Sequence, residues 1–229
     1  MSAVRFAWPG ARRFSLAVDG FAVPRGERLL IIGASGAGKS TLLSLMCGVV
    51  TAQAGTLRVL GKDIGGLSGG ARDRFRAEHF GIIFQMFNLL PYGSVLDNVL
   101  LPLSFAPARR ARATAAGSAQ EEARRLLRSL GLDDDLVHGS RAAELSVGQQ
   151  QRVAAARALI GAPEIIVADE PTSALDRDRR QIFLDLLFDQ VNRADGTLVM
   201  VSHDATLAPH FHRIVRFDDI ATTMRGDGR

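Results

Sequence analysis

The sequence predicts an α/β protein built on a mostly parallel sheet. Three continuous apolar runs, 80–84, 164–168 and 197–201, alternate along the chain with segments of helical periodicity. Strands of a parallel sheet are covered on both faces, so they appear in a sequence as unbroken apolar runs. A fourth run, 29–32, leads into a glycine-rich loop and an apolar helix face, the order found in phosphate-binding domains.

The glycine-rich loop fits a P-loop NTPase core. Glycines let the backbone curl so that its N–H groups converge on phosphate oxygens, and the following helix adds its positive dipole end. Lys39 can reach the β- and γ-phosphates, and the Ser40 hydroxyl can ligate magnesium. We therefore predict binding of ATP or GTP with Mg²⁺. The candidate residues of this loop are Gly33, Ser35, Gly36, Ala37, Gly38, Lys39, Ser40 and Thr41.

Composition limits the class of protein. Among 229 residues, 47% are hydrophobic and 23% are charged, which is ordinary for a soluble globular chain. The net charge of +4 is spread along the chain and gives little support for a nucleic-acid partner, so none is expected. Cys47 is the single cysteine, which excludes an internal disulfide and favours a core position. No apolar run approaches the ~20 residues of a membrane span, which predicts a cytosolic protein, at most peripheral to a membrane.

The start of the chain and its middle differ from the parallel core. Short strands are expected at 4–8, 14–18 and 21–23, with tight connections that indicate an antiparallel edge subdomain. The stretch 86–160 lies between sheet strands and is mostly helical, so it should form an inserted helical lobe. We expect a single domain over 1–229, with a nucleotide-binding core of 1–85 and 161–229 and a helical subdomain of 86–160.

One stretch of this lobe, 106–119, is rich in Ala, Arg, Pro and Gly and has little periodicity. It predicts a mobile or loosely helical surface segment. Its arginines, Arg109, Arg110 and Arg112, favour a solvated face over contact with lipid headgroups.

Two acidic residues follow the strand predicted at 164–168. In nucleotide hydrolases an acid at the end of such a strand lies beside magnesium, which suits Asp169. Glu170 adds a second carboxylate that can act on an attacking water. In a chain that also has a phosphate-binding loop, this pair indicates nucleotide hydrolysis.

Trp8 is the only tryptophan and has two possible roles. It could be a half-buried strand aromatic, or it could offer a stacking surface to a nucleotide base.

With these motifs in place, the chain resembles the ATP-binding subunits of ABC transporters over nearly its whole length. The motifs follow the family's order. They are the phosphate loop Gly33–Thr41, the glutamine loop at Gln85, the signature Leu145–Gln149, the acidic strand Ile165–Pro171, the aspartate loop Ser173–Asp176 and the switch histidine His203.

The resemblance implies an ATPase whose active unit is a homodimer with two shared ATP sites. Trp8 would stack on adenine, while Ser40 and Gln85 would hold Mg²⁺, with Asp169 joining through water. Glu170 would be the general base, Lys39 would bind phosphate and His203 would contact the γ-phosphate. Ser146, Gly148 and Gln149 would contact the ATP of the opposite subunit, and Asp176 would bridge the interface.

A narrower similarity points to the lipoprotein-releasing and macrolide-export branch. It rests on Gln85 with Phe87, on Leu89–Pro91, and on Asp97–Val99 with the Pro102–Leu103 pair. In the family a helix of a membrane subunit docks after the glutamine loop. The resemblance therefore implies a transmembrane permease partner at Gln85–Pro91 and a peripheral place on the cytoplasmic face of the inner or plasma membrane.

Val147 departs from the family pattern, which usually has glycine there. If position 147 needs a positive φ, a β-branched residue costs about 1–2 kcal/mol and the signature is impaired. If φ is negative, the valine keeps its N–H donor and nothing is lost. We expect the negative φ, because Gln85, Glu170 and His203 are all in place.

Two other functions remain open at this point. A soluble ABC ATPase acting on DNA or ribosomes usually carries long coiled-coil insertions, zinc sites or a second ATPase domain, and none is evident here. A force-transmitting regulatory ATPase of an envelope complex shares every motif, so the sequence alone does not separate it from a transporter subunit.

Overall fold

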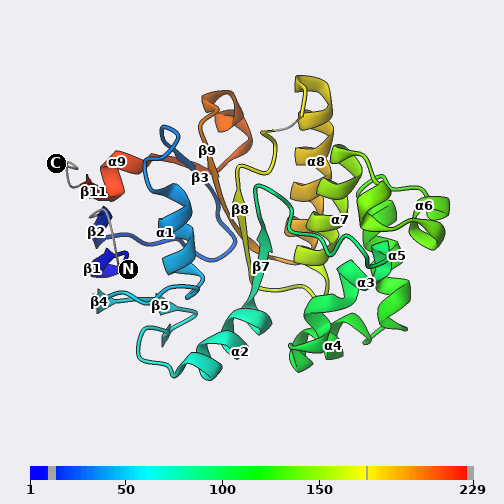
Figure 1. The fold of residues 1–229 in the computed structure, drawn as a ribbon, viewed down its shortest axis with the longest axis horizontal. Coiled ribbons are helices and arrows are strands. Elements are labelled where there is room, and N and C mark those ends of the chain that lie inside the picture. The colour runs from blue at the N-terminus through cyan, green and yellow to red at the C-terminus, as the bar shows by residue number, and fades with distance from the viewer. Residues whose placement is uncertain (10–13, 174, 226–229) are drawn as a thin grey trace. The chain divides into compact units, whose positions relative to one another are not determined.

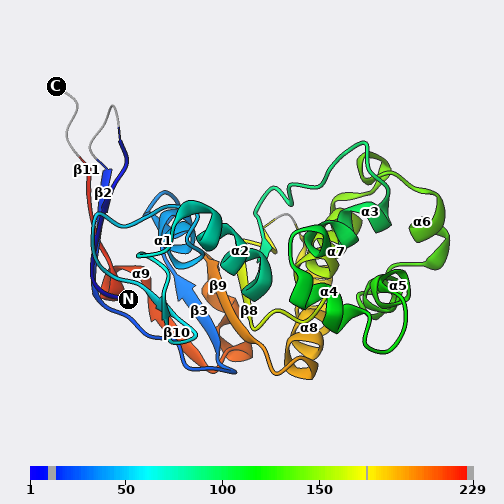
Figure 2. The ribbon, with the colours of Figure 1, turned by 90° about the horizontal axis from the view of Figure 1, so that it is seen from below.

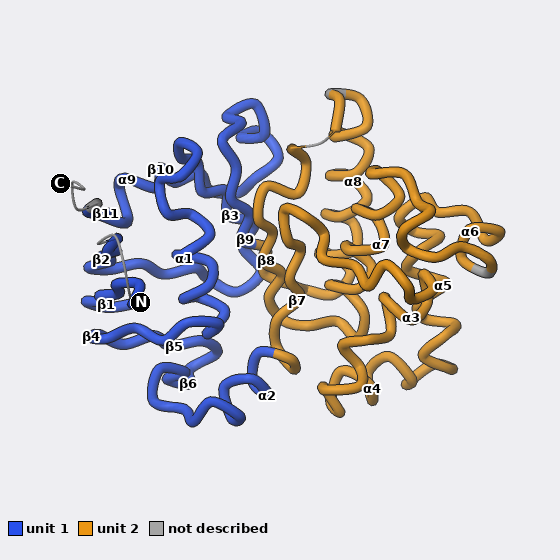
Figure 3. The backbone as a smooth tube through the Cα atoms, viewed as in Figure 1, with its two compact units in different colours: residues 1–76, 199–229 blue, residues 77–198 orange. Residues whose placement is uncertain are grey.

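The structure is a computed structural model that describes residues 1–9, 14–173 and 175–225 (Figure 1). The chain divides into two compact units, 1–76 with 199–229, and 77–198 (Figure 3).

An antiparallel sheet of strand order β11-β2-β1-β4 forms one side of the first unit. In it, β1 pairs with β2, and the facing residues Val4 and Val18, and Phe6 and Leu16, are all buried. This period of two is the alternation that the sequence showed. The strands are β1 (Ser2–Ala7), β2 (Phe14–Gly20), β4 (Ala54–Thr56) and β11 (Thr222–Arg225).

The strand expected at 21–23 does not form, and that expectation was wrong. Strand β2 ends at Gly20, and the backbone of Phe21 instead pairs with the first residue of the chain. The N–H of Phe21 donates to the carbonyl of Met1 at 3.0 Å, and the Met1 amino group donates to the carbonyl of Phe21 at 2.8 Å.

The parallel strands of the first unit run in the order β10-β3-β9. Strand β3 pairs in parallel with β10, and its residues Leu29, Leu30 and Ile31 are completely buried, as an unbroken apolar run predicts. Helix α1 follows β3, and α9 follows β10. The bounds are β3 (Arg28–Ile32), α1 (Lys39–Met46), β9 (Thr197–Ser202), β10 (Arg213–Arg216) and α9 (Phe217–Ile220).

Smaller elements complete this part of the chain. They are the antiparallel pair β5 (Arg58–Val59) and β6 (Lys62–Asp63), the helix α2 (Gly69–His79) and the 3-10 helix η3 (Ala205–His210).

The second unit begins and ends with sheet strands and holds helices between them (Figure 2). Strand β7 (Phe80–Ile83) pairs in parallel with β8 (Ile165–Asp169), so the intervening chain is one long crossover. This crossover is helical, as expected for 86–160. Its helices are α3 (Val95–Leu100), η1 (Leu101–Ser104), α4 (Pro107–Ala113), α5 (Ala119–Ser129), α6 (Asp134–Gly139), η2 (Ala142–Glu144) and α7 (Val147–Leu159), and α8 (Arg177–Arg193) follows β8.

Helix α4 corrects the expectation for 106–119, which predicted a mobile or loosely helical surface. Arg109 of this helix is buried, with 2% of its surface exposed, and is therefore neither a solvated nor a lipid-facing residue. Its guanidinium donates to the carbonyls of Phe80, Ala158 and Ile160 at 3.0, 3.0 and 2.5 Å. These carbonyls belong to β7 and to the end of α7, so the arginine joins three elements.

The other two arginines of the segment are exposed, in line with a solvated face. Arg110 donates to the carbonyl of Leu103 at 3.0 Å, and Arg112 donates to that of Gly161 at 2.7 Å. Each therefore combines a solvent-facing charge with an anchored side chain. No helix among the described residues is long and apolar enough to cross a membrane.

Candidate nucleotide-binding site

The phosphate loop has the backbone that its glycines predict. Gly36 and Gly38 have φ angles of +76° and +114°, a region that other residues avoid. Gly38 is also the N-cap of α1, and a Cβ there would lie 2.9 Å from the ring of Phe14. Only glycine fits this position, because both the angle and the space exclude a side chain.

Lys39 begins helix α1 and is 6% exposed. Its ammonium donates to the carbonyls of Gly33 and Ala34 at 2.7 and 3.1 Å. The cation therefore lies inside the curl of the loop, next to the backbone that carries the phosphate-binding N–H groups. Ser40 follows on the exposed side of the first turn.

Trp8 lies directly after β1 and remains 45% exposed. Its ring meets Phe6 edge to face, with centroids 5.1 Å apart, and its backbone N–H donates to the carbonyl of Phe14 at 3.3 Å. The ring of Phe14 lies close to Gly38, so the backbone of Trp8 is bonded to a residue beside the phosphate loop. This arrangement suits a base-stacking role.

His203 follows β9 in the same unit and is exposed. The preceding residue, Ser202, is buried, and its carbonyl accepts the N–H of Gly33 at 3.2 Å. This bond joins the end of β9 to the start of the phosphate loop. The structure thus brings the predicted switch histidine beside the predicted phosphate-binding residues.

The second unit brings together Gln85 and the two acids. In the parallel pair of β7 and β8, Ile83 is opposite Ala168. Gln85 follows Ile83 by two residues and Glu170 follows Ala168 by two, so both come after the same end of the paired strands. Asp169 is the last residue of β8. The amide oxygen of Gln85 and the carboxylate of Asp169 are hard oxygen ligands, the kind that Mg²⁺ prefers.

Glu170 has an unusual backbone. Its φ is +47°, in the left-handed region that a residue with a side chain seldom adopts, and it is 8% exposed. Such strain costs about 1–3 kcal/mol and is concentrated at functional sites. The turn after it is fixed by the N–H of Ser173, which donates to the Glu170 carbonyl at 3.2 Å.

The signature residues form the start of helix α7. Ser146 is the N-cap, its hydroxyl accepts the N–H of Gln149 at 3.4 Å, and the Gln149 side chain accepts the N–H of Ser146 at 2.8 Å. This reciprocal capping box places the helix start at Val147. Val147 is helical, has no positive φ and is 49% exposed. This agrees with the expectation of a negative φ, at which valine keeps its N–H donor without strain.

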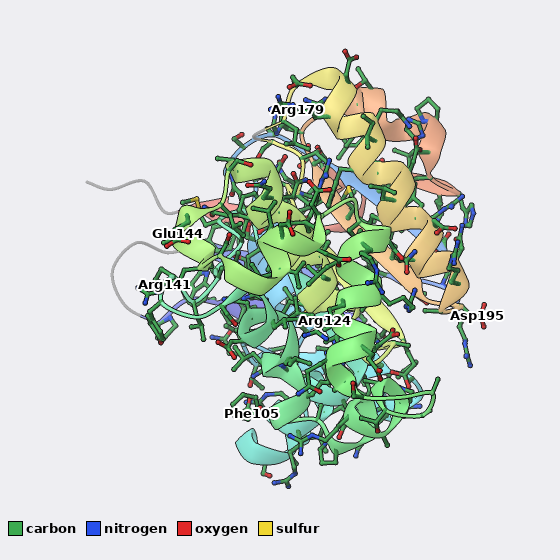
Figure 4. All side chains as sticks on the ribbon, turned by 90° about the vertical axis from the view of Figure 1, so that its right-hand side faces the viewer. Phe105, Arg124, Arg141, Glu144, Arg179 and Asp195 are labelled. Carbon is green, nitrogen blue, oxygen red and sulfur yellow. The ribbon has the colours of Figure 1, made fainter. Side chains whose placement is uncertain are left out.

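Just before the signature, a turn runs from Arg141 to Glu144. The backbone N–H of Arg141 donates to Oε2 of Glu144 at 3.0 Å and closes this turn (Figure 4).

Asp176, in the aspartate loop, is the exposed N-cap of α8. Its Oδ1 accepts the N–H of Arg179 at 2.9 Å. Its role at a dimer interface is not tested by these contacts and stays a prediction.

The segment Gln85–Pro91 presents apolar side chains to solvent. Met86 is 81% exposed and the neighbouring Tyr92 is 76% exposed, whereas Phe87 is buried. Two large exposed apolar side chains close together in the chain offer a candidate binding surface. Phe105, also exposed, lies well apart from Arg141 and Glu144 in the view of Figure 4.

Two buried residues of α7 that contact the site loops were not predicted from the sequence. Gln151 donates to the carbonyl of Pro171 at 2.6 Å, next to Glu170. Arg157 donates to the carbonyl of Asn88 at 2.7 Å and to that of Phe87. The signal available in the sequence was Arg157 itself, a charge inside the otherwise apolar run 153–160.

A parallel α/β core with this phosphate loop, an acidic strand end and a capped signature helix defines a P-loop ATPase. The family model described as "ABC transporter" matches residues 17–173. The chain belongs to the ABC transporter family, in which it is an ATP-binding, ATP-hydrolysing subunit.

Relatives support this assignment. The chain is 41% identical to "Uncharacterized ABC transporter ATP-binding protein YbbA" of Escherichia coli strain K12, over 85% of this chain and 82% of that protein. It is 42% identical to "Lipoprotein-releasing system ATP-binding protein LolD 2" of Rhodospirillum rubrum, over 82% of this chain and 78% of that protein. It is 40% identical to a "Macrolide export ATP-binding/permease protein MacB" of Bradyrhizobium diazoefficiens, over 86% of this chain but 29% of that protein. These names match the branch expected from the sequence.

A solved structure gives the same fold. It is titled as the dimeric post-hydrolysis state of the ATP-binding cassette MJ0796 bound to ADP and Pi. The TM-score is 0.81 at 31% identity, over 100% of this chain and 98% of that one. The expected α/β P-loop fold with an antiparallel β subdomain is therefore confirmed.

Proposed function

We propose that the chain forms a homodimer around ATP and uses ATP hydrolysis to drive a separate transmembrane subunit. The observation that carries this proposal is the phosphate loop, with its left-handed glycines and with Lys39 held inside its curl. The dimeric state of the cassette MJ0796 and the permease part named in the MacB relative support the assembly.

In this proposal the residues of the first unit bind the nucleotide. Trp8 stacks on adenine, the loop N–H groups and Lys39 bind phosphate, and His203 contacts the γ-phosphate. The ligands of Mg²⁺ are Ser40 and Gln85, with Asp169 acting through water. When bound, the ion neutralises charge on the phosphates.

Glu170 takes the proton of the attacking water. Its residue has the left-handed backbone described above and is 8% exposed, which limits the freedom of the side chain. Ser146, Gly148 and Gln149 of the opposite protomer complete the site, with the N–H groups of the start of α7 directed at phosphate. Asp176 bridges the two protomers.

The membrane partner docks at Gln85–Pro91, where Met86 offers its exposed side chain. We place the complex peripherally on the cytoplasmic face of the inner or plasma membrane, with no nucleic acid. The division into a nucleotide-binding core, 1–85 with 161–229, and a helical subdomain, 86–160, belongs to the same proposal.

The test of this function is Glu170→Gln, which keeps the shape of the side chain and removes the base. We expect ATP to bind, hydrolysis to fall about 100-fold or more, and a dimer to accumulate with ATP. Phosphate release and size-exclusion chromatography measure the two effects. A matched control is Glu144→Gln, since Glu144 caps the turn before the signature without a proposed role in chemistry. A Glu170→Gln protein that stays monomeric and hydrolyses ATP at the normal rate contradicts the proposal.

A further inference from the structure

The turn that carries Gln85 is closed on itself by two short-range bonds. The N–H of Phe87 donates to the carbonyl of Phe84 at 3.0 Å, so Gln85 and Met86 are the central residues of this turn. The N–H of Asn88 then donates to the carbonyl of Met86 at 2.6 Å. The position of Phe87 therefore constrains the backbone path of the turn that carries Gln85.

The backbone of this turn is strained. Phe87 and Asn88 have φ angles of +58° and +48°, two consecutive left-handed residues with side chains. A three-residue turn with positive φ at its centre is rare and strained. Such a conformation persists only where the surroundings hold it in place.

Arg157 holds the turn in place through hydrogen bonds to its carbonyls. It lies on the signature helix α7, is 8% exposed, and its two terminal nitrogens donate separately to the carbonyls of Asn88 and Phe87. A planar guanidinium can bind both carbonyls at once, which fixes their relative direction. Burial lowers the pKa of Arg157, but an arginine stays protonated at neutral pH.

We infer that Arg157 is a positioning residue for ATP hydrolysis, which acts by fixing the left-handed turn and, through it, Gln85. The inference rests on the proposed function, in which Gln85 is a ligand of Mg²⁺. It adds a physical link between the helix that begins with the signature and the residue that meets the metal.

A double-mutant cycle tests the link, with Arg157→Lys and Gln85→Ala alone and combined. Lysine keeps the charge but lacks the rigid planar fork that fixes the relative direction of the two carbonyls, so the turn loosens. In the wild-type background we expect Arg157→Lys to lower kcat about tenfold, to leave the KM for ATP within about twofold, and to raise the Mg²⁺ concentration for half-maximal rate. In the Gln85→Ala background the same substitution should change kcat by less than about twofold, because the group it positions is gone.

Arg152→Lys is the matched control. Arg152 lies on the same helix and donates to the carbonyl of Gly131 at 2.6 Å, away from the turn. Its effect on kcat should be small and the same in both backgrounds.

Asn88→Val tests the same idea without touching the buried arginine. Asn88 is exposed, and a β-branched residue resists its left-handed φ. This variant should also lower kcat only while Gln85 is present, and it keeps the inference testable if Arg157→Lys fails to fold.

The outcomes separate the inference from the proposed function. A wild-type protein without Mg²⁺-dependent ATPase activity refutes the function. An active wild type in which Arg157→Lys and Asn88→Val lower kcat equally with and without Gln85 overturns the positioning role.

Discussion

Val147 is compatible with the backbone of the signature helix. A valine at a position of positive φ would be strained, but here it is the first residue of α7 and has no positive φ. The capping box of Ser146 and Gln149 fixes the helix start on either side of it. The N–H that matters for phosphate binding belongs to the backbone, which valine and glycine share.

Val147→Gly should therefore change the ATPase rate of the dimer by less than about tenfold, equivalent to ~1.4 kcal/mol. Glycine also lowers helix propensity, so a small loss of stability is expected. Steady-state hydrolysis at saturating ATP is the measurement. Activity found only in the glycine variant would show that the native homodimer is not the working unit.

Cys47 is a buried thiol next to the end of α1, as its apolar surroundings in the sequence predicted. Burial raises its pKa to about 12, because a thiolate is poorly solvated in the core. The unfolded thiol titrates near its ordinary value, so between the two pKa values the unfolded state loses a proton that the folded state keeps. Through this group, stability is unaffected below about pH 8 and falls as pH rises above about 9.

The expected result is slow alkylation of Cys47 by iodoacetamide at pH 8 in the folded protein and rapid alkylation in denaturant. Mass spectrometry after timed quenching measures both rates. Equal rates in the two states would contradict a buried thiol.

At the scale of elements, the sequence predicts well where local pattern and tertiary structure agree. The run 29–32, the glycine loop and α1 were all predicted, because strand, turn and helix signals follow one another there. Strand β11 was missed, since its four residues form a strand only by pairing with β2. The burial of Arg109 in α4 was missed because its support comes from carbonyls about fifty residues away, which no local pattern records.

The two residues that tie α7 to the site, Gln151 and Arg157, were missed for the same reason. Their partners are the loops after β8 and β7, and only the fold brings those loops to the helix. The residues of the motifs themselves were predicted from their order along the chain and from the family resemblance, and the roles given to them stay predictions.

Arg109→Met should destabilise the protein by about 2–5 kcal/mol, since it leaves several buried carbonyls without a donor. Burial lowers the pKa of Arg109 to about 10, which still leaves it charged at pH 7. Urea denaturation followed by circular dichroism gives the free energy of unfolding. The control Arg110→Met, at an exposed neighbour, should cost less than about 1 kcal/mol. Similar losses in both variants would show that burial of Arg109 is not what holds α4.

At the scale of the whole molecule, the chain combines an ATPase site with a surface that suits a membrane subunit. The described residues contain no membrane-crossing helix, while Met86 and Tyr92 are the most exposed large apolar residues near the glutamine loop. A partner that covers these side chains would receive the motion of the segment that also carries Gln85. The same surface would serve a transporter or a force-transmitting regulatory complex.

Met86→Asp should therefore weaken binding to the membrane partner, because a charge replaces the apolar contact at the proposed docking surface. We expect wild-type protein to sediment with native membrane vesicles and not with vesicles of pure lipid, and Met86→Asp to lose at least about tenfold in the bound fraction at limiting protein. Phe105→Asp is the matched control, since Phe105 is 64% exposed but lies outside Gln85–Pro91, and it should bind as wild type does. Both variants should retain ATPase activity in solution, which separates lost docking from a lost fold.

Sedimentation of the wild-type protein with vesicles of pure lipid would contradict this docking surface. It would assign the membrane contact to exposed basic residues such as Arg110 and Arg112, and Met86→Asp would then leave binding unchanged.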